Sequence, residues 1–380
     1  MDEETLNKLN IIADRIILNE SKSPLDSELL LNMLKKMITA RLINKPNNGV
    51  EVLLSREEIL KRVLNFYKSI DTEYYSEALD FLLQLKKNKS LEIFFGKKDG
   101  FKQYPVTSSG RYNYDYIFDD AKIYIYPRPN EKNNKIKTQN KNTDFIQNSV
   151  TIVHEIAHSF DINQTDGVLS EVITDDQIQI SKSKKFKGII NKIEENKKVR
   201  NIFSETTAVT FEKLYTQYLM EMTDYPKSNI SSIAIERFNT SLYNADECYD
   251  NLRIAKIKKE KGRICNDDIN LLMEEYNESR ETTEKRIKRI IRQNGQINEM
   301  KKYAIAGLFA PTIASHYQAN GVKVLKQYIE AVKNNSIDQI FDLLEISKNE
   351  NGIDTLFINM KKQIEPYCFY PNKKNTILEK

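Results

Sequence analysis

The sequence predicts a mainly α-helical protein with one small β-sheet. Glycine and proline contribute only 11 and 9 of the 380 residues, which is typical of a helix-rich chain. Apolar residues recur at helical spacing along most of the chain, whereas aromatic and β-branched residues concentrate between residues 91 and 129. The length allows a large buried core, which we expect to divide into two lobes.

The amino-terminal region, residues 1–90, is predicted to contain four helices. Two apolar stripes within residues 3–45 predict the first two helices. The segment Ser55–Glu58 matches a capping box, in which serine and glutamate side chains cap the first turn, and it opens the third helix. The fourth helix begins at Asp71 or Thr72. Stripes of this kind are typical of core packing.

The strand-forming part of the chain comes next. Residues 112–118 and 121–126 are predicted to form a β-hairpin that turns at Asp119 and Asp120. The polar stretch 130–142 contains almost no apolar residue and is predicted to be a loop. Its position directly before the next helix suggests that it overhangs that helix.

That helix, predicted to begin near Thr143 or Asp144, carries the pattern His-Glu-x-x-His at His154, Glu155 and His158. These are two of only three histidines in the chain. Positions i and i+4 lie on one helix face, so both imidazoles can bind one metal ion. Glu155 projects from the edge of this face and can hold a water molecule in the open position of the metal, which is the zincin arrangement. The flanking residues predict a buried helix: Val150, Ile152, Val153, Ile156, Ala157 and Phe160.

A catalytic zinc ion needs a third protein ligand and one open position. The segment from Phe203 to Tyr218 is predicted to be a helix, and it places Glu205 on the same face as apolar neighbours. A buried carboxylate is costly unless it is paired or bound to a metal. We therefore choose Glu205 as the third ligand. Other acidic residues remain open as alternatives: Glu171, Asp175 and Asp176.

Two further acidic residues are expected to support the ligands from outside the coordination shell. Glu212 follows Glu205 after two helical turns, so it can bond a ligand histidine and orient the ring. Asp161 follows His158 by three residues and is the second candidate for such a supporting role.

The remainder of the chain is predicted to be helical. The charge-dense stretch 182–200 is typical of a solvated surface helix. Residues 228–260 and 266–293 are long and highly charged, and we expect two helices packed antiparallel.

Composition excludes several classes of function. Lysine and arginine number 58 against 54 acidic residues, and no basic cluster indicates a nucleic-acid surface. Three cysteines without metal or redox spacing argue against a disulfide framework. The start of the chain is acidic and unlike a signal peptide, and no apolar stretch is long enough for a membrane span. We expect a cytoplasmic protein.

Four segments, in this order, resemble the thimet oligopeptidase family of zinc metallopeptidases, a gluzincin-type family, and especially its oligoendopeptidase F branch. They are Gly96–Phe101, Thr151–Phe160, Glu205–Glu212 and Tyr303–Tyr317. The resemblance extends over roughly residues 60–370. The family has glycine where this chain has Ala157.

The resemblance implies a zinc-dependent hydrolase of oligopeptides, with two helical lobes flanking a substrate cleft and a zincin-type catalytic core. It also implies that Tyr303 stabilises the oxyanion, and that Glu205 is the third metal ligand. Compared with the family, the chain has an insertion at residues 163–200 and is shortened at the amino terminus.

We accordingly expect a helical region at 1–90 and a zincin-like catalytic domain at 91–380. The catalytic domain would contain the small sheet at 91–129, the metal helices at 143–224 and a carboxy-terminal helical lobe at 226–370.

Two other functions stay open. The first is a protease dedicated to one protein or precursor, because lethal-factor-like toxins also combine His-Glu-x-x-His with a distant glutamate. The second is a peptide-binding protein of the same fold without turnover. The expected partners are oligopeptides, with neither nucleic acid nor membrane. One Zn²⁺ per chain is expected, although cobalt or manganese also suits nitrogen and oxygen ligands.

Overall fold

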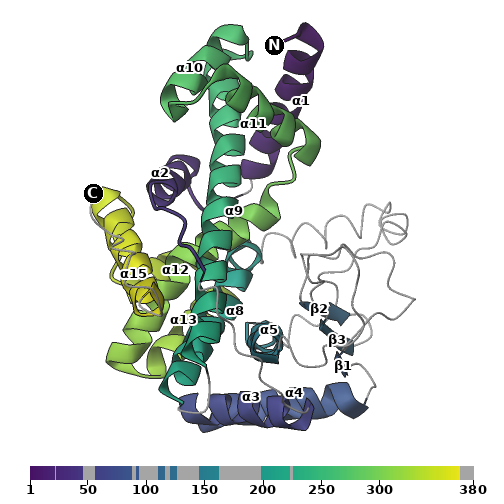
Figure 1. Cartoon of the computed structure of the whole chain (residues 1–380), viewed down its shortest axis with the longest axis vertical. Coiled ribbons are helices and arrows are strands. Elements are labelled where there is room, and N and C mark those ends of the chain that lie inside the picture. The colour runs from purple at the N-terminus through teal and green to yellow at the C-terminus, as the bar shows by residue number, and fades with distance from the viewer. Residues whose placement is uncertain are drawn as a thin grey trace.

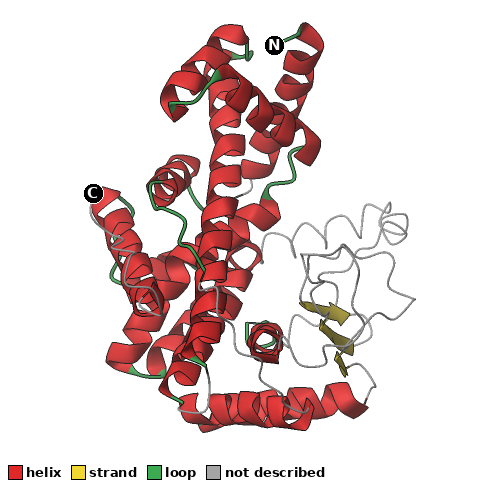
Figure 2. Cartoon of the chain, viewed as in Figure 1, coloured by secondary structure: helices red, strands yellow, loops and turns green. Residues whose placement is uncertain are grey.

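The computed structural model describes residues 1–21, 23–45, 56–87, 91–93, 110–115, 120–125, 145–161, 198–222 and 226–368. In these residues the protein is mainly helical, and the strands lie to one side (Figure 2). The predicted loop 130–142 and most of the 163–200 insertion fall outside the described residues, as do Glu171, Asp175 and Asp176.

One long helix, α9 (Lys227–Lys261), forms the axis of the molecule (Figure 1). Along one half it contacts α1 (Glu3–Glu20) and α2 (Ser27–Ile38). Along the other half it contacts α12 (Asn298–Asn320) and α15 (Glu350–Cys368). Two short helices, α13 (Lys323–Lys333) and α14 (Ile337–Leu343), join α12 to α15.

Helices α9 and α12 approach closely because one position lacks a side chain. A Cβ atom added at Gly307 of α12 would lie 2.4 Å from the Cβ of Ser241 on α9. Any other residue at this position would push the two helices apart.

The metal-motif helix α5 (Phe145–Ala157) lies between three other structures. It packs on α8 (Lys198–Glu221), on α3 (Arg56–Ile70), which itself packs on α4 (Thr72–Lys87), and on the sheet. The apolar residues flanking its motif are buried as predicted. The Tyr67 hydroxyl of α3 donates a hydrogen bond of 2.8 Å to the carbonyl of Val153, directly before the first histidine. Several elements therefore fix the position of α5.

The sheet has three strands in the order β1 (Leu91–Ile93), β3 (Asp120–Ile125), β2 (Gly110–Asp115). β1 and β3 are parallel, whereas β2 and β3 are antiparallel. Both β2 and β3 begin earlier than predicted. Asp120, expected in the turn, pairs instead with Asp115.

The prediction of one helix over 266–293 is wrong. The structure has α10 (Asn266–Tyr276) and α11 (Arg280–Gln293), separated by a break. Asn277 adopts a left-handed conformation with φ of 51°, which asparagine tolerates better than most residues. The Ser279 side chain then caps α11 by accepting a hydrogen bond from the Thr282 amide. The main partners of α9 are α12, α2 and α1, and its contact with α11 is smaller.

Candidate metal centre

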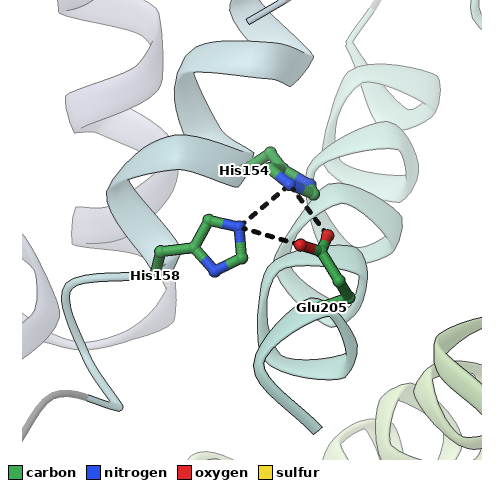
Figure 3. Close-up of side chains that lie close together, drawn as sticks. All are labelled: His154, His158 and Glu205. Atoms are coloured by element: carbon green, nitrogen blue, oxygen red, sulfur yellow. Dashed lines mark hydrogen bonds and ion pairs between the residues drawn. The ribbon is translucent and has the colours of Figure 1, made fainter. Parts of the chain in front are cut away.

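Three side chains from two segments converge on one point (Figure 3). His154 lies in α5, His158 lies in the turn that follows Ala157, and Glu205 lies in α8. The Nε2 atoms of the two histidines are 3.1 Å apart. The carboxylate oxygens of Glu205 lie 3.3 Å from Nε2 of His154 and 3.8 Å from Nε2 of His158. The predicted choice of Glu205 therefore places a carboxylate next to the histidine pair.

This donor set fits a single divalent ion. Ligand atoms about 2.0–2.1 Å from a tetrahedral zinc ion lie about 3.3 Å from one another, close to the separations found here. His154 and Glu205 are buried, and His158 is partly buried. Two imidazoles and one carboxylate leave a fourth tetrahedral position for a water molecule.

Glu212 holds His154 from the opposite side of the ring. Its Oε1 atom lies 3.0 Å from Nδ1 of His154, so a neutral ring carries its proton on Nδ1 and leaves Nε2 available as a ligand. Glu212 thus lies beside a ligand histidine, and its role in orienting the ring stays a prediction. The sequence did not reveal Arg237 of α9, whose Nη2 atom lies 3.0 Å from the same Glu212 oxygen. No local pattern marks Arg237, because only the packing of α9 on α8 brings it to Glu212.

Removal of the Glu212 charge should weaken metal binding. In a Glu212→Gln variant the side chain keeps its size but loses the carboxylate that orients His154. We expect the dissociation constant for zinc to rise by about 10- to 100-fold, the usual effect of losing such a partner. Competition with a chromophoric chelator measures this constant. An unchanged constant would mean that Glu212 does not orient the ligand.

Asp161 lies in the turn that follows α5. Its carboxylate is fully buried and accepts a hydrogen bond of 3.1 Å from Nε of Arg200 in the first turn of α8. This ion pair joins the segment that carries His158 to the helix that carries Glu205. Asp161 can therefore support the ligands through the placement of both segments.

Burial and neighbouring charges shift the pKa values of the two histidines in opposite directions. Burial alone would lower the pKa of His154, but the carboxylates of Glu212 and Glu205 outweigh it and raise this pKa to about 10. Burial lowers the pKa of His158 to about 3. The pKa of Glu205 falls to about 2 despite burial, because the two histidines stabilise its charged form.

Metal binding should therefore release a proton. Without a metal, His154 is protonated at neutral pH, because its pKa lies above the pH of the solution. A histidine must be neutral to bind a metal, so the ion displaces this proton and binds more tightly as the pH rises. We expect about one proton released per zinc ion near pH 7. Calorimetric titration in buffers of different ionisation enthalpy measures this number, and a value of zero would contradict the protonated state of His154.

Two residues with predicted catalytic roles lie close to the ligands. Glu155 is buried next to His154, and burial raises its pKa to about 7. Tyr303 lies on α12, which packs along α8. The negative charge of Glu205, together with burial and the charge of Glu155, raises the pKa of Tyr303 above its usual range. The hydroxyl of Tyr303 therefore stays protonated at neutral pH and can act as a hydrogen-bond donor.

Comparisons with known proteins do not assign the chain to a family. No protein-family model matches the chain, and no curated protein matches it. A crystal structure of a candidate peptidase from Chlamydophila abortus aligns with a TM-score of 0.48 and 13% sequence identity. The alignment covers 95% of this chain and 55% of that protein, so this chain spans about half of its length. Membership in the oligopeptidase family that the motifs resemble stays a prediction.

In the described residues, no helix combines the length and apolar character that crossing a membrane requires.

Proposed function

We propose that the protein is a zinc-dependent metallopeptidase that hydrolyses oligopeptides. The observation that carries the proposal is the convergence of His154, His158 and Glu205 from two segments of the chain. The buried Glu155 supports it, because a carboxylate beside such a centre is the base that peptide hydrolysis requires.

The nature of the donors favours zinc. Two imidazole nitrogens and one carboxylate oxygen form a ligand set that is typical of catalytic zinc sites. When bound, the ion would polarise a water molecule and the carbonyl group of the scissile peptide bond. Cobalt or manganese could replace zinc with the same ligands.

Glu155 is the proposed general base. Its carboxylate accepts one proton from the water molecule as the water oxygen bonds to the peptide carbon. The same proton then passes to the peptide nitrogen as the carbon–nitrogen bond breaks. In the metal-free site, burial raises the pKa of Glu155 to about 7, which is near the pH at which a group can both accept and donate a proton.

Tyr303 is the proposed donor to the oxyanion. As the water oxygen attacks, negative charge develops on the peptide carbonyl oxygen, and the protonated Tyr303 hydroxyl can donate a hydrogen bond to it. Tyr303 lies near enough to Glu205 for the carboxylate charge to raise the pKa of its hydroxyl, which supports a position beside the site.

Two measurements test the proposal. A quenched random-peptide library should be cleaved by the zinc-loaded protein, and a chelator should abolish the cleavage. If metal binds stoichiometrically but no peptide in the library is cleaved, the protein is not a general oligopeptidase. Incubation with single intact proteins would then distinguish a dedicated protease from a peptide-binding protein.

A further inference from the structure

A second polar site lies away from the three metal ligands. It is a cavity of about 30 Å³ at the junction of α8, α9, α12 and α15, with α5 at one side. A cavity needs about 10–15 Å³ for each water molecule, so this one accommodates about two. Its wall includes Glu212, which is the residue that also contacts His154. Neither ligand histidine nor Glu205 lines it.

The charged groups in the wall are unbalanced. Lys213 and Arg237 contribute two positive charges, and Glu212 contributes one negative charge, which is shared with His154. The described residues provide one ion-pair partner for the Arg237 guanidinium, and this is Glu212. Within the same part of the chain, no hydrogen bond or ion pair is found for the Lys213 ammonium. Two cationic groups at one cavity thus retain donors without acceptors.

The other polar groups of the wall are already engaged. The Ser241 hydroxyl donates to the carbonyl of Arg237, and the Thr216 hydroxyl donates to the carbonyl of Lys213. The Gln363 amide nitrogen donates to the Ser315 hydroxyl. The donors that remain for an occupant of the cavity therefore belong to the two cationic side chains.

We propose that this cavity binds one small monovalent anion, of the size of chloride, between the Lys213 ammonium and the Arg237 guanidinium. An anion would balance the excess positive charge of the three charged side chains in the wall, which are Glu212, Lys213 and Arg237. A volume of about 30 Å³ suits an ion of the size of chloride. Burial lowers the pKa of Lys213 to about 8, although the charge of Glu212 opposes this shift.

The anion is coupled to the metal centre through Arg237 and Glu212. An anion beside Arg237 competes with Glu212 for the guanidinium charge. The Glu212 carboxylate then interacts more strongly with Nδ1–H of His154, which makes Nε2 a better ligand. The negative charge of the anion near the metal centre also favours the binding of a cation there. Occupancy of the cavity should therefore tighten metal binding.

Diffraction from bromide-soaked crystals of the full chain tests the site directly. Bromide resembles chloride in size and scatters anomalously. We expect an anomalous peak in the cavity within hydrogen-bond distance of Nζ of Lys213 and of the Arg237 guanidinium. Peaks confined to other surfaces would identify an adventitious ion only and overturn the proposal. This test does not depend on peptidase activity, so its failure is distinguishable from failure of the proposed function.

Zinc affinity measured in two salts at equal ionic strength tests the coupling. We expect the dissociation constant for zinc to be about tenfold lower in sodium chloride than in sodium isethionate, whose anion is too large for the cavity. Lys213→Met keeps the aliphatic stem and should remove this difference. Lys259→Met, at an exposed position on α9, should retain it. Equal chloride dependence in both variants would overturn the coupling.

Discussion

Replacing Glu155 by glutamine should leave the metal bound and abolish peptide hydrolysis. Glutamine has nearly the same size and shape, so the buried position beside His154 stays filled. It cannot accept a proton from the attacking water, and loss of a positioned base typically costs about 100- to 10,000-fold in rate. Metal content and the turnover of a defined peptide, measured on the same preparation, separate the two effects.

The matched control is Glu221→Gln, an exposed glutamate at the end of α8, which should hydrolyse the peptide at the rate of the unsubstituted protein. If Glu155→Gln hydrolysed peptides as fast as the unsubstituted protein, another group would be the base. Loss of metal together with activity would instead show that Glu155 helps to hold the ion.

Replacing Glu205 by alanine should remove the metal itself. Without this carboxylate only the two imidazoles remain of the three donors. Loss of a supporting partner costs about 10- to 100-fold in metal affinity, and loss of a direct ligand should exceed that range. Isothermal titration with zinc measures the change, and circular dichroism shows whether the helices are retained. Glu221→Ala on the same helix should bind zinc normally.

The Glu205 experiment also decides between the possible third ligands. If the Glu205→Ala variant bound zinc as tightly as the unsubstituted protein, a different acidic residue would have to complete the site. The candidates are those that the sequence left open: Glu171, Asp175 and Asp176. Alanine substitution of each residue in turn would then identify the ligand.

The candidate site was partly predictable because some of its features are local. The spacing of His154 and His158 follows from the helical repeat, so any helix over this segment places both rings on one face. Glu205 and Glu212 could be chosen because a carboxylate on a buried helix face requires a partner. Each of these inferences needs only the sequence within one helix, and in the structure the side chains of His154, His158 and Glu205 lie together.

Other features could not be predicted, because they arise between segments that are distant in the sequence. No periodicity indicates that Arg237 of α9 reaches Glu212, or that Asp161 pairs with Arg200. The same holds for the cavity beside Lys213, to which five helices contribute. The break at Asn277 depends on one residue in a left-handed conformation, and a charged helical pattern on both sides of that residue conceals it.

The sequence by itself therefore determined the helical character of the protein, the pair of histidines and the choice of the acidic residues around them. Each of these depends on the repeat of a single helix or on the cost of burying one charge. The tertiary structure alone decided how α5, α8 and α9 come together, and hence which charges surround His154. Such contacts depend on the packing of whole helices, and that packing is a collective result of side chains spread over the entire chain.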